Sequence, residues 1–229
     1  MNKIVYNRIF WSLITLLSTY YLYRAFRFRF VVEGLGPSFW NKQFWYVLHI
    51  SVALLPLILG PFQFWNWFRQ HHMKWHRLLG KVYIVGSVLG GLSAFYLGAT
   101  LPLQGSVVPI ILLSWLWLFM TVAAWITIRR KNIKAHRLFM IRSYVLALVF
   151  IWLRILDDLI YKHGFLSFIG DEGIRSTTHE WMSWVIPLLV MEMIISWWPL
   201  IKAKPKLGKV VSAEKIPTSN KDIVDREPK

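Results

Sequence analysis

The 229-residue sequence contains no cysteine, which excludes disulfide bonds, thiolate metal sites, iron–sulfur clusters and a cysteine nucleophile. It also contains no G-x-S-x-G, H-E-x-x-H or P-loop pattern, so hydrolase chemistry has no support in its motifs. Acidic side chains are scarce: 11 Asp and Glu stand against 27 Lys and Arg, for a formal net charge of +16. These absences leave open whether the chain is an enzyme of another kind.

The excess of positive charge is compatible with nucleic-acid binding, but its distribution argues against that partner. The cations form short clusters between long apolar runs, 56% of the residues are hydrophobic, and mean hydropathy is +0.44. Residues 106–128 carry no charge, and a helix of that length crosses a hydrocarbon core of about 30 Å. The composition therefore predicts a membrane protein that binds no nucleic acid.

The apolar runs predict an all-α integral membrane protein, because backbone polar groups in lipid must be satisfied within each segment. The alternating ten-residue segments of a membrane β-barrel are absent. The first run lacks a small-residue cleavage site and is interpreted as a retained span. We expect one transmembrane domain over residues 1–201 and a disordered basic tail over 202–229. The expected spans are about 4–23, 43–68, 81–103, 106–128, 138–161 and 180–201.

Lys and Arg are concentrated in the loops near 69–81 and 129–142 and after residue 201, rather than in the loops near 24–42 and 162–175. Because cytoplasmic loops carry the excess of Lys and Arg, both termini are predicted to face the cytoplasm. The run Arg24, Arg27 and Arg29 is the exception, since it falls in the first external loop. The cytoplasmic cations are expected to contact anionic lipid; protein partners are not indicated.

A sequence pattern that recurs after sixty residues predicts an internal repeat. Both copies contain the pattern R-x6-HRL, with His76 in the first and His136 in the second, and Trp65 matches Trp125. Two parallel hairpins, 43–103 and 106–161, would form a four-helix bundle with the first and last spans outside it. The alternative is that cations simply recur at cytoplasmic corners.

Polar residues within the apolar spans are functional candidates, because they are costly in lipid. Six are expected in one external layer: His49, Arg154, Asp157, Asp158, His179 and Glu180. They form either structural ion pairs and a hydrogen-bonded core histidine, or a pocket for a head group, quinone or cofactor propionate. Glu192 lies deeper in the last span and is either a neutral acid or a carboxylate with a buried partner.

His76 and His136 form the second group of candidates. As a pair at equal depth they match the way a bundle holds a b-type haem, with nearby arginines suited to its propionates. Because the spans are expected to begin at 81 and 138, both histidines precede them, which favours a structural role in the head-group layer. His49 is a third candidate for haem or quinone binding. His72 and His76 have metal-ligand spacing but no third ligand, so no metal site is predicted.

Four segments carry a family resemblance: LHISVALLPLILGPFQF, R-x6-HRLLGKVYIVGSVLGG, IRRKNIKAHRLFMIRSYVLAL and WLRIL. Over residues 44–200 the chain resembles the bacterial membrane proteins called domain of unknown function 2306 (DUF2306), which implies a multi-span inner-membrane protein. It is remotely similar to four-helix transmembrane cytochromes b, which have a duplicated hairpin and a histidine before a helix glycine, as in His76-x3-Gly80. Those proteins normally carry four ligand histidines, and residues 106–128 contain none, so at most one haem is expected.

Three functions follow as hypotheses. The first is transmembrane electron transfer with a b-type haem or a quinone. The second is a non-enzymatic transporter or a lipid- or small-molecule-binding protein, for which the parallel repeat and Glu192 are the motivation. The third is an accessory or scaffold subunit that uses its basic faces.

Overall fold

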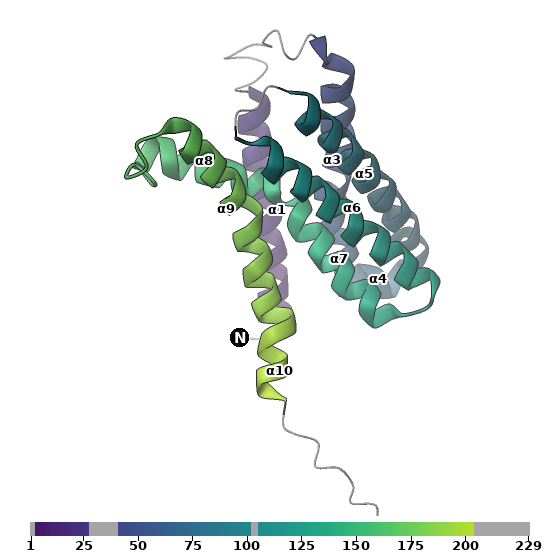
Figure 1. Ribbon diagram of the computed structural model, residues 1–229. Coiled ribbons are helices and arrows are strands. Elements are labelled where there is room, and N and C mark those ends of the chain that lie inside the picture. Colours follow the sequence, from purple (N-terminus) through teal and green to yellow (C-terminus); the bar gives the residue numbers. More distant parts are fainter. Residues whose placement is uncertain (1–2, 28–40, 102–104, 204–229) are drawn as a thin grey trace, which may run out of the picture.

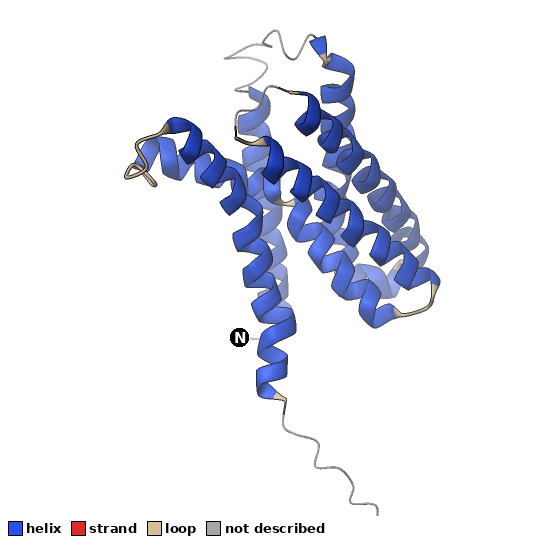
Figure 2. Ribbon diagram, in the orientation of Figure 1, coloured by secondary structure: helices blue, strands red, loops and turns tan. Residues whose placement is uncertain are grey.

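The structure, a computed structural model, describes residues 3–27, 41–101 and 105–203. The expected disordered tail therefore lies almost entirely outside the described residues. All regular structure in the described ranges is helical, as Figure 2 shows. Five helical stretches are long and apolar enough to cross a membrane: Gln43–Phe64, Met73–Thr100, Val107–Arg129, Ile133–His163 and Glu172–Lys202. The prediction of an all-α membrane protein is confirmed.

The chain forms its helices in a simple order. The helices are α1 (Lys3–Arg27), α3 (Gln43–Phe64), α4 (Asn66–His71), α5 (Met73–Thr100), α6 (Val107–Arg129), α7 (Ile133–Ala147), α8 (Val149–His163), α9 (Glu172–Glu192), a π-helical turn (Met193–Trp197) and α10 (Trp198–Lys202). The first expected span is thus helical, but α1 is not among the five membrane-spanning candidates. The count of six spans stays a prediction.

Four helices form a closed bundle at the centre of the molecule. Helix α3 packs on α5, α5 on α6, α6 on α7, and α7 returns to α3, so α5 and α7 lie on one diagonal of the bundle (Figure 1). Helix α1 packs on α3 and α8, whereas α9 packs on α7, α8 and α6. A four-helix core with the first and last helices outside it was expected, but the second hairpin leaves the bundle at Leu148, because α8 packs on α9 and α1. The repeat itself stays a prediction.

Both ends of the described chain lie on one side of the molecule. Figure 1 shows the start of α1 and the end of α10 at the end of the bundle that also carries the α3–α4–α5 and α6–α7 turns. We call this end the turn end. Helix α8 follows a break at Leu148 and turns away from the bundle, and α9 runs back from it (Figure 1).

Hydroxyl groups connect three helices in the bundle core. Tyr83 of α5 is fully buried, and its hydroxyl lies 3.2 Å from Ser143 Oγ of α7. Ser143 Oγ lies in turn 2.8 Å from Thr121 Oγ1 of α6. Because lipid tails are as apolar as leucine, membrane helices associate through close packing and such hydrogen bonds rather than by burying apolar surface.

Helices α3 and α7 meet where the sequence reads Gly-Pro. Pro61 has no N–H and therefore leaves the carbonyl of Leu57, four residues earlier, without its helical donor. The Tyr144 hydroxyl donates to that oxygen at 3.5 Å. Gly60 makes this approach feasible, since a Cβ there would lie 2.0 Å from the Tyr144 ring. The Tyr144 hydroxyl thus satisfies the carbonyl that Pro61 leaves without a helical donor.

Several helices extend beyond the apolar runs that predicted them. Helix α5 begins at Met73 rather than at 81, and α7 begins at Ile133 rather than at 138. The side chain of Asn132 accepts a hydrogen bond from the backbone N–H of Ala135, which caps the start of α7. The expectation that His76 and His136 precede their helices is therefore wrong: each lies in the first turns of one.

Candidate functional site

His76 and His136 lie on the two diagonally opposed helices α5 and α7. Tyr83 and Ser143 follow them by seven residues, nearly two helical turns, so each lies on the same helix face as its histidine. Since Tyr83 reaches Ser143 across the α5–α7 diagonal, the two imidazoles share that diagonal about 10 Å nearer the turn end. Both are half-buried, and the charge of one acts on the other.

In each imidazole ring, Nδ1 contacts a polar group of another helix. His136 Nδ1 lies 2.8 Å from the backbone oxygen of Ala124 in α6; because a carbonyl only accepts, Nδ1 carries the proton. The amide of the buried residue Gln63, in α3, faces His76 Nδ1. With its nitrogen toward the ring, it donates to Nδ1 at 3.1 Å; turned over, its oxygen would accept from Nδ1–H. In both rings Nε2 is left for another partner.

The surroundings of this pair are positively charged. The charges of Arg69 and Arg77 act on the His76 ring. The sequence contains no Asp or Glu from residue 34 to residue 156, and the carboxylates in the ion pairs of the described residues belong to Asp157, Asp158 and Glu192. Among the described residues, Arg69 and Arg77 beside the histidine pair form no ion pair with a carboxylate, and their charge favours an anion there.

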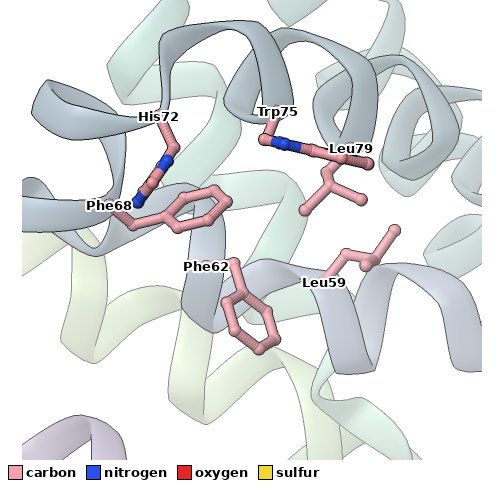
Figure 3. A pocket seen from close by; sticks show the side chains of 6 residues that line it. All are labelled: Leu59, Phe62, Phe68, His72, Trp75 and Leu79. Atoms are coloured by element: carbon pink, nitrogen blue, oxygen red, sulfur yellow. The ribbon is translucent and has the colours of Figure 1, made fainter.

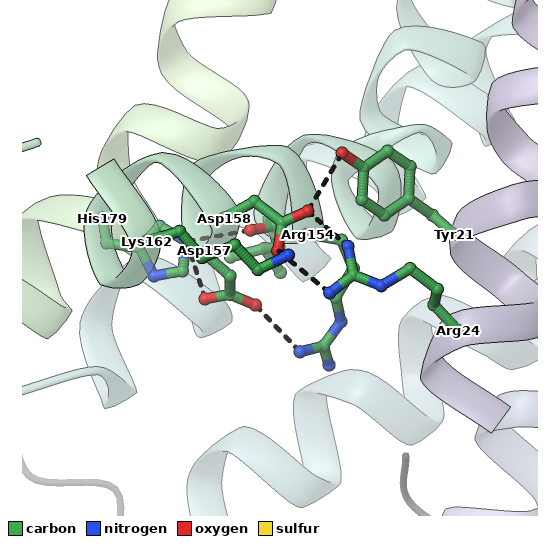
Figure 4. A network of polar contacts seen from close by, with 8 residues as sticks. Tyr21, Arg24, Arg154, Asp157, Asp158, Lys162 and His179 are labelled. Carbon is green, nitrogen blue, oxygen red and sulfur yellow. Dashed lines mark hydrogen bonds and ion pairs between the residues drawn. The ribbon is translucent and has the colours of Figure 1, made fainter. Parts of the chain in front are cut away.

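An ion-pair network lies along the second half of α8 and is drawn in Figure 4. Asp158 pairs with Arg24 of α1, whose Nη2 lies 3.0 Å from Oδ1, and it accepts from Lys162 at 2.9 Å and from the Tyr21 hydroxyl at 3.4 Å. Arg24 thus finds an acidic partner in a different helix.

The neighbouring carboxylate has its own partners. Asp157 binds Arg154 at 2.9 Å and lies 3.4 Å from His179 Nε2, which also donates to the backbone oxygen of Leu153 at 3.1 Å. The structure therefore brings together Arg154, Asp157, Asp158 and His179, four of the six residues expected in one layer. Of the two acids open to Arg154, it binds Asp157.

His49, also expected in that layer, lies elsewhere. Its Nδ1 is 3.1 Å from the backbone oxygen of Gly90 and 3.2 Å from Ser93 Oγ, both in α5. His49 therefore links α3 to α5 within the bundle, which is the hydrogen-bonded core histidine among the alternatives. It is not part of the network around Asp157 and Asp158, and the pair formed by His76 and His136 does not include it.

Glu192 has a cationic partner in the bundle. Arg142 of α7 binds it through two nitrogens, with Nη2 at 2.8 Å from Oε2. Ser196, in the π-helical turn that follows Glu192, donates to Oε2 at 2.6 Å and accepts from Arg142 at 3.0 Å. Of the two states expected for Glu192, these contacts favour the paired carboxylate over the neutral acid.

Two hollows on the described part of the chain are lined by residues other than the histidine pair. The first, of about 430 Å³, lies where α3, α4 and α5 meet and is lined by Leu59, Phe62, Phe68, His72, Trp75 and Leu79 (Figure 3). The second, of about 350 Å³, lies at the start of α9 beside Gly105. Among the described residues, no three His, Asp or Glu side chains gather as metal ligands would.

One functional candidate escaped the reasoning from sequence. Gln63 is the amide that faces His76. The sequence marks it as a polar side chain inside the apolar run of α3, and such a side chain is costly in lipid without a partner. Arg24 was noticed only as an exception to the charge rule, because its partner Asp158 is far away in the sequence.

Comparison with known proteins bears on identity. No curated protein and no solved structure matches the chain, so the similarity to cytochromes b stays a prediction. The sequence model of a family described as predicted membrane protein (DUF2306) matches residues 46–195. That range covers four of the five membrane-spanning candidates completely or nearly so, and most of the fifth. The chain therefore belongs to the DUF2306 family of predicted membrane proteins.

Proposed function

We propose that this membrane protein holds one b-type haem between His76 and His136 and takes part in electron transfer across the bilayer. The observation that carries the proposal is the placement of the two imidazoles at equal depth on diagonally opposed helices, with each Nδ1 engaged by the protein. Histidines that bind iron through Nε2 have Nδ1 held by a carbonyl or another acceptor, which orients the ring.

The residues around the pair suit this group. Ala124 holds the His136 ring through its carbonyl. Gln63, whose nitrogen donates to His76 Nδ1, would supply the corresponding acceptor after a half-turn of its amide. Arg69 and Arg77 supply positive charge for two propionates. The pair lines neither of the two hollows described above. A bound haem would supply one-electron oxidation and reduction.

The remaining contributions come from the chain itself. The hydroxyls of Tyr83, Ser143 and Thr121 lie deeper in the bundle and close the site on the hydrocarbon side. The absence of Asp and Glu from residue 34 to residue 156 keeps acidic side chains off the four helices of the bundle. We place the protein in the bacterial inner membrane with the turn end and both termini in the cytoplasm, on the strength of the Lys and Arg distribution.

A quinone at the same rings is the second candidate. When the Gln63 amide donates to His76 Nδ1, the neutral ring carries its proton on Nε2. His76 would then donate to one quinone oxygen, and His136 would accept from the hydroxyl that the other oxygen carries once the group is reduced. The transporter alternative has less support, because the carboxylate of Glu192 is occupied by Arg142.

The test is the absorption spectrum of the full-length protein purified from haem-sufficient cells. We expect a Soret band and a reduced-minus-oxidised difference spectrum that disappear in both His76→Ala and His136→Ala. His49→Ala is the matched control, because this histidine lies in the same bundle but hydrogen-bonds to Gly90 and Ser93 of α5; it should keep the spectrum.

Two results would count against haem. The first is a colourless wild-type protein that elutes as a single species in gel filtration. The second is a spectrum that survives both alanine variants. A colourless protein that co-purifies with a quinone, lost in both variants, would instead support the second candidate.

A further inference from the structure

The two histidines are held by groups of different chemistry. The partner of His136 is a backbone carbonyl, which can only accept a hydrogen bond and therefore keeps the proton on Nδ1. The partner of His76 is a side-chain amide, which donates on one side and accepts on the other. A half-turn of that amide exchanges the two. One ring of the pair is therefore fixed, and the other depends on Gln63.

The surroundings of Gln63 favour one orientation. With its nitrogen toward the start of α5, the amide donates to His76 Nδ1 at 3.1 Å and approaches the backbone oxygen of His76 at 3.3 Å. Its oxygen then accepts from the backbone N–H of Gly80 at 3.3 Å. In the opposite orientation the amide oxygen would face the backbone oxygen of His76, and two hydrogen-bond acceptors would lie against each other. The contacts therefore favour a His76 ring with its proton on Nε2.

Space for the amide comes from Gly80. A Cβ at that position would lie 3.2 Å from Gln63 Oε1, closer than ordinary contact. The positions sixty residues later are Ala123 for Gln63 and Met140 for Gly80, so the second hairpin has neither the amide nor the space. Gln63 and Gly80 together form a local device that belongs to His76 alone.

We propose that Gln63 is the positioning residue that decides which nitrogen of His76 carries the proton. It thereby sets whether His76 presents an N–H or a lone pair to a group between the two rings. With the amide nitrogen toward the ring, the pair offers one donor and one acceptor; after the amide turns over, it offers two lone pairs. The inference rests on the proposed function for the identity of that group, since the first state suits a quinone and the second a haem iron.

The test follows the His76 proton directly. Full-length protein labelled with ¹⁵N-histidine and purified without haem is compared with Gln63→Glu at a pH where the rings are neutral, and the Nδ1 and Nε2 shifts identify the tautomer. In the wild type we expect His76 mainly with Nε2–H. A carboxylate only accepts, so Gln63→Glu should move the ratio of tautomers toward Nδ1–H by about tenfold or more. His136 should have Nδ1–H in both proteins.

Gln70→Glu is the control, because it places the same charge on an exposed glutamine of α4. It should leave the His76 tautomer unchanged. A His76 tautomer that is the same in wild type and Gln63→Glu would overturn the inference, and so would an equal change in Gln70→Glu. A wild type that never binds haem would defeat the haem proposal but leave this measurement valid. In a haem-loaded protein, Gln63→Glu should lower the reduction potential, and Gln70→Glu should change it much less.

Discussion

Gly60→Ala should lower the free energy of unfolding by about 3 kcal/mol, at the upper end of what added atoms cost in a packed core. The new Cβ would lie 2.0 Å from Tyr144 Cε2 and 2.4 Å from Cδ2. Tyr144 is 4% exposed, so its ring has no free space into which to move. Either α3 separates from α7 or the ring leaves the Leu57 carbonyl. We expect the midpoint of thermal unfolding in detergent, followed by helical circular dichroism, to fall by roughly 6–12 °C.

Gly170→Ala is the matched control for this substitution. Gly170 lies in the segment between α8 and α9, and a Cβ there would meet nothing within 4 Å. The same chemical change should therefore leave the unfolding midpoint within about 2 °C of wild type, because surface substitutions usually cost little. Equal midpoints for the Gly60 and Gly170 variants would mean that the contact between Gly60 and Tyr144 does not hold the bundle together.

Arg142→Met should destabilise the protein by about 3–5 kcal/mol, the range found when one partner of a buried ion pair is removed. The side chains of Arg142 and Glu192 are only 15% and 21% exposed. Without the guanidinium, Glu192 keeps only the Ser196 hydroxyl, and an unpaired carboxylate in lipid is costly. Because this pair joins α7 to α9, we also expect the last helix to become accessible to protease before the bundle unfolds.

Two further variants make the result specific. Arg142→Met combined with Glu192→Leu should recover most of the loss, since replacing a buried pair by apolar side chains is often neutral. Arg154→Met removes a pair whose arginine is 45% exposed and should cost less than about 1 kcal/mol. If Arg142→Met and Arg154→Met proved equally mild, the Arg142–Glu192 pair would not anchor α9.

Reasoning from sequence predicted the bundle well and its helix ends poorly. Residues 106–128 indicated a spanning helix because they are apolar throughout, and α6 covers Val107–Arg129. The start of α5 was placed at 81, yet the helix begins at Met73. The charged residues before 81 are disfavoured in lipid but not in a helix that projects beyond it. Depth in the membrane and helical structure are separate properties, and hydropathy reports only the first.

The candidate site shows the same division. His76 and His136 were found from the repeated HRL pattern, because spacing along the chain is visible in a sequence. Their partners were not predicted: Gln63 and Ala124 lie in other helices, and nothing local marks which side chain or carbonyl will face an imidazole. The sequence allowed Arg154 to pair with either of two acids on its helix face, Asp157 or Asp158. It did not show that Arg24 would bind Asp158.

By itself, the sequence determined that the chain is a helical membrane protein of the DUF2306 family, because lipid restricts apolar segments to helices and the motifs lie within single segments. Only the tertiary structure decided the pairings: α5 diagonal to α7, Arg142 with Glu192, and one histidine held by a carbonyl while the other faces an amide. These depend on how helices rotate and pack against one another, which is set by contacts between residues distant in the chain.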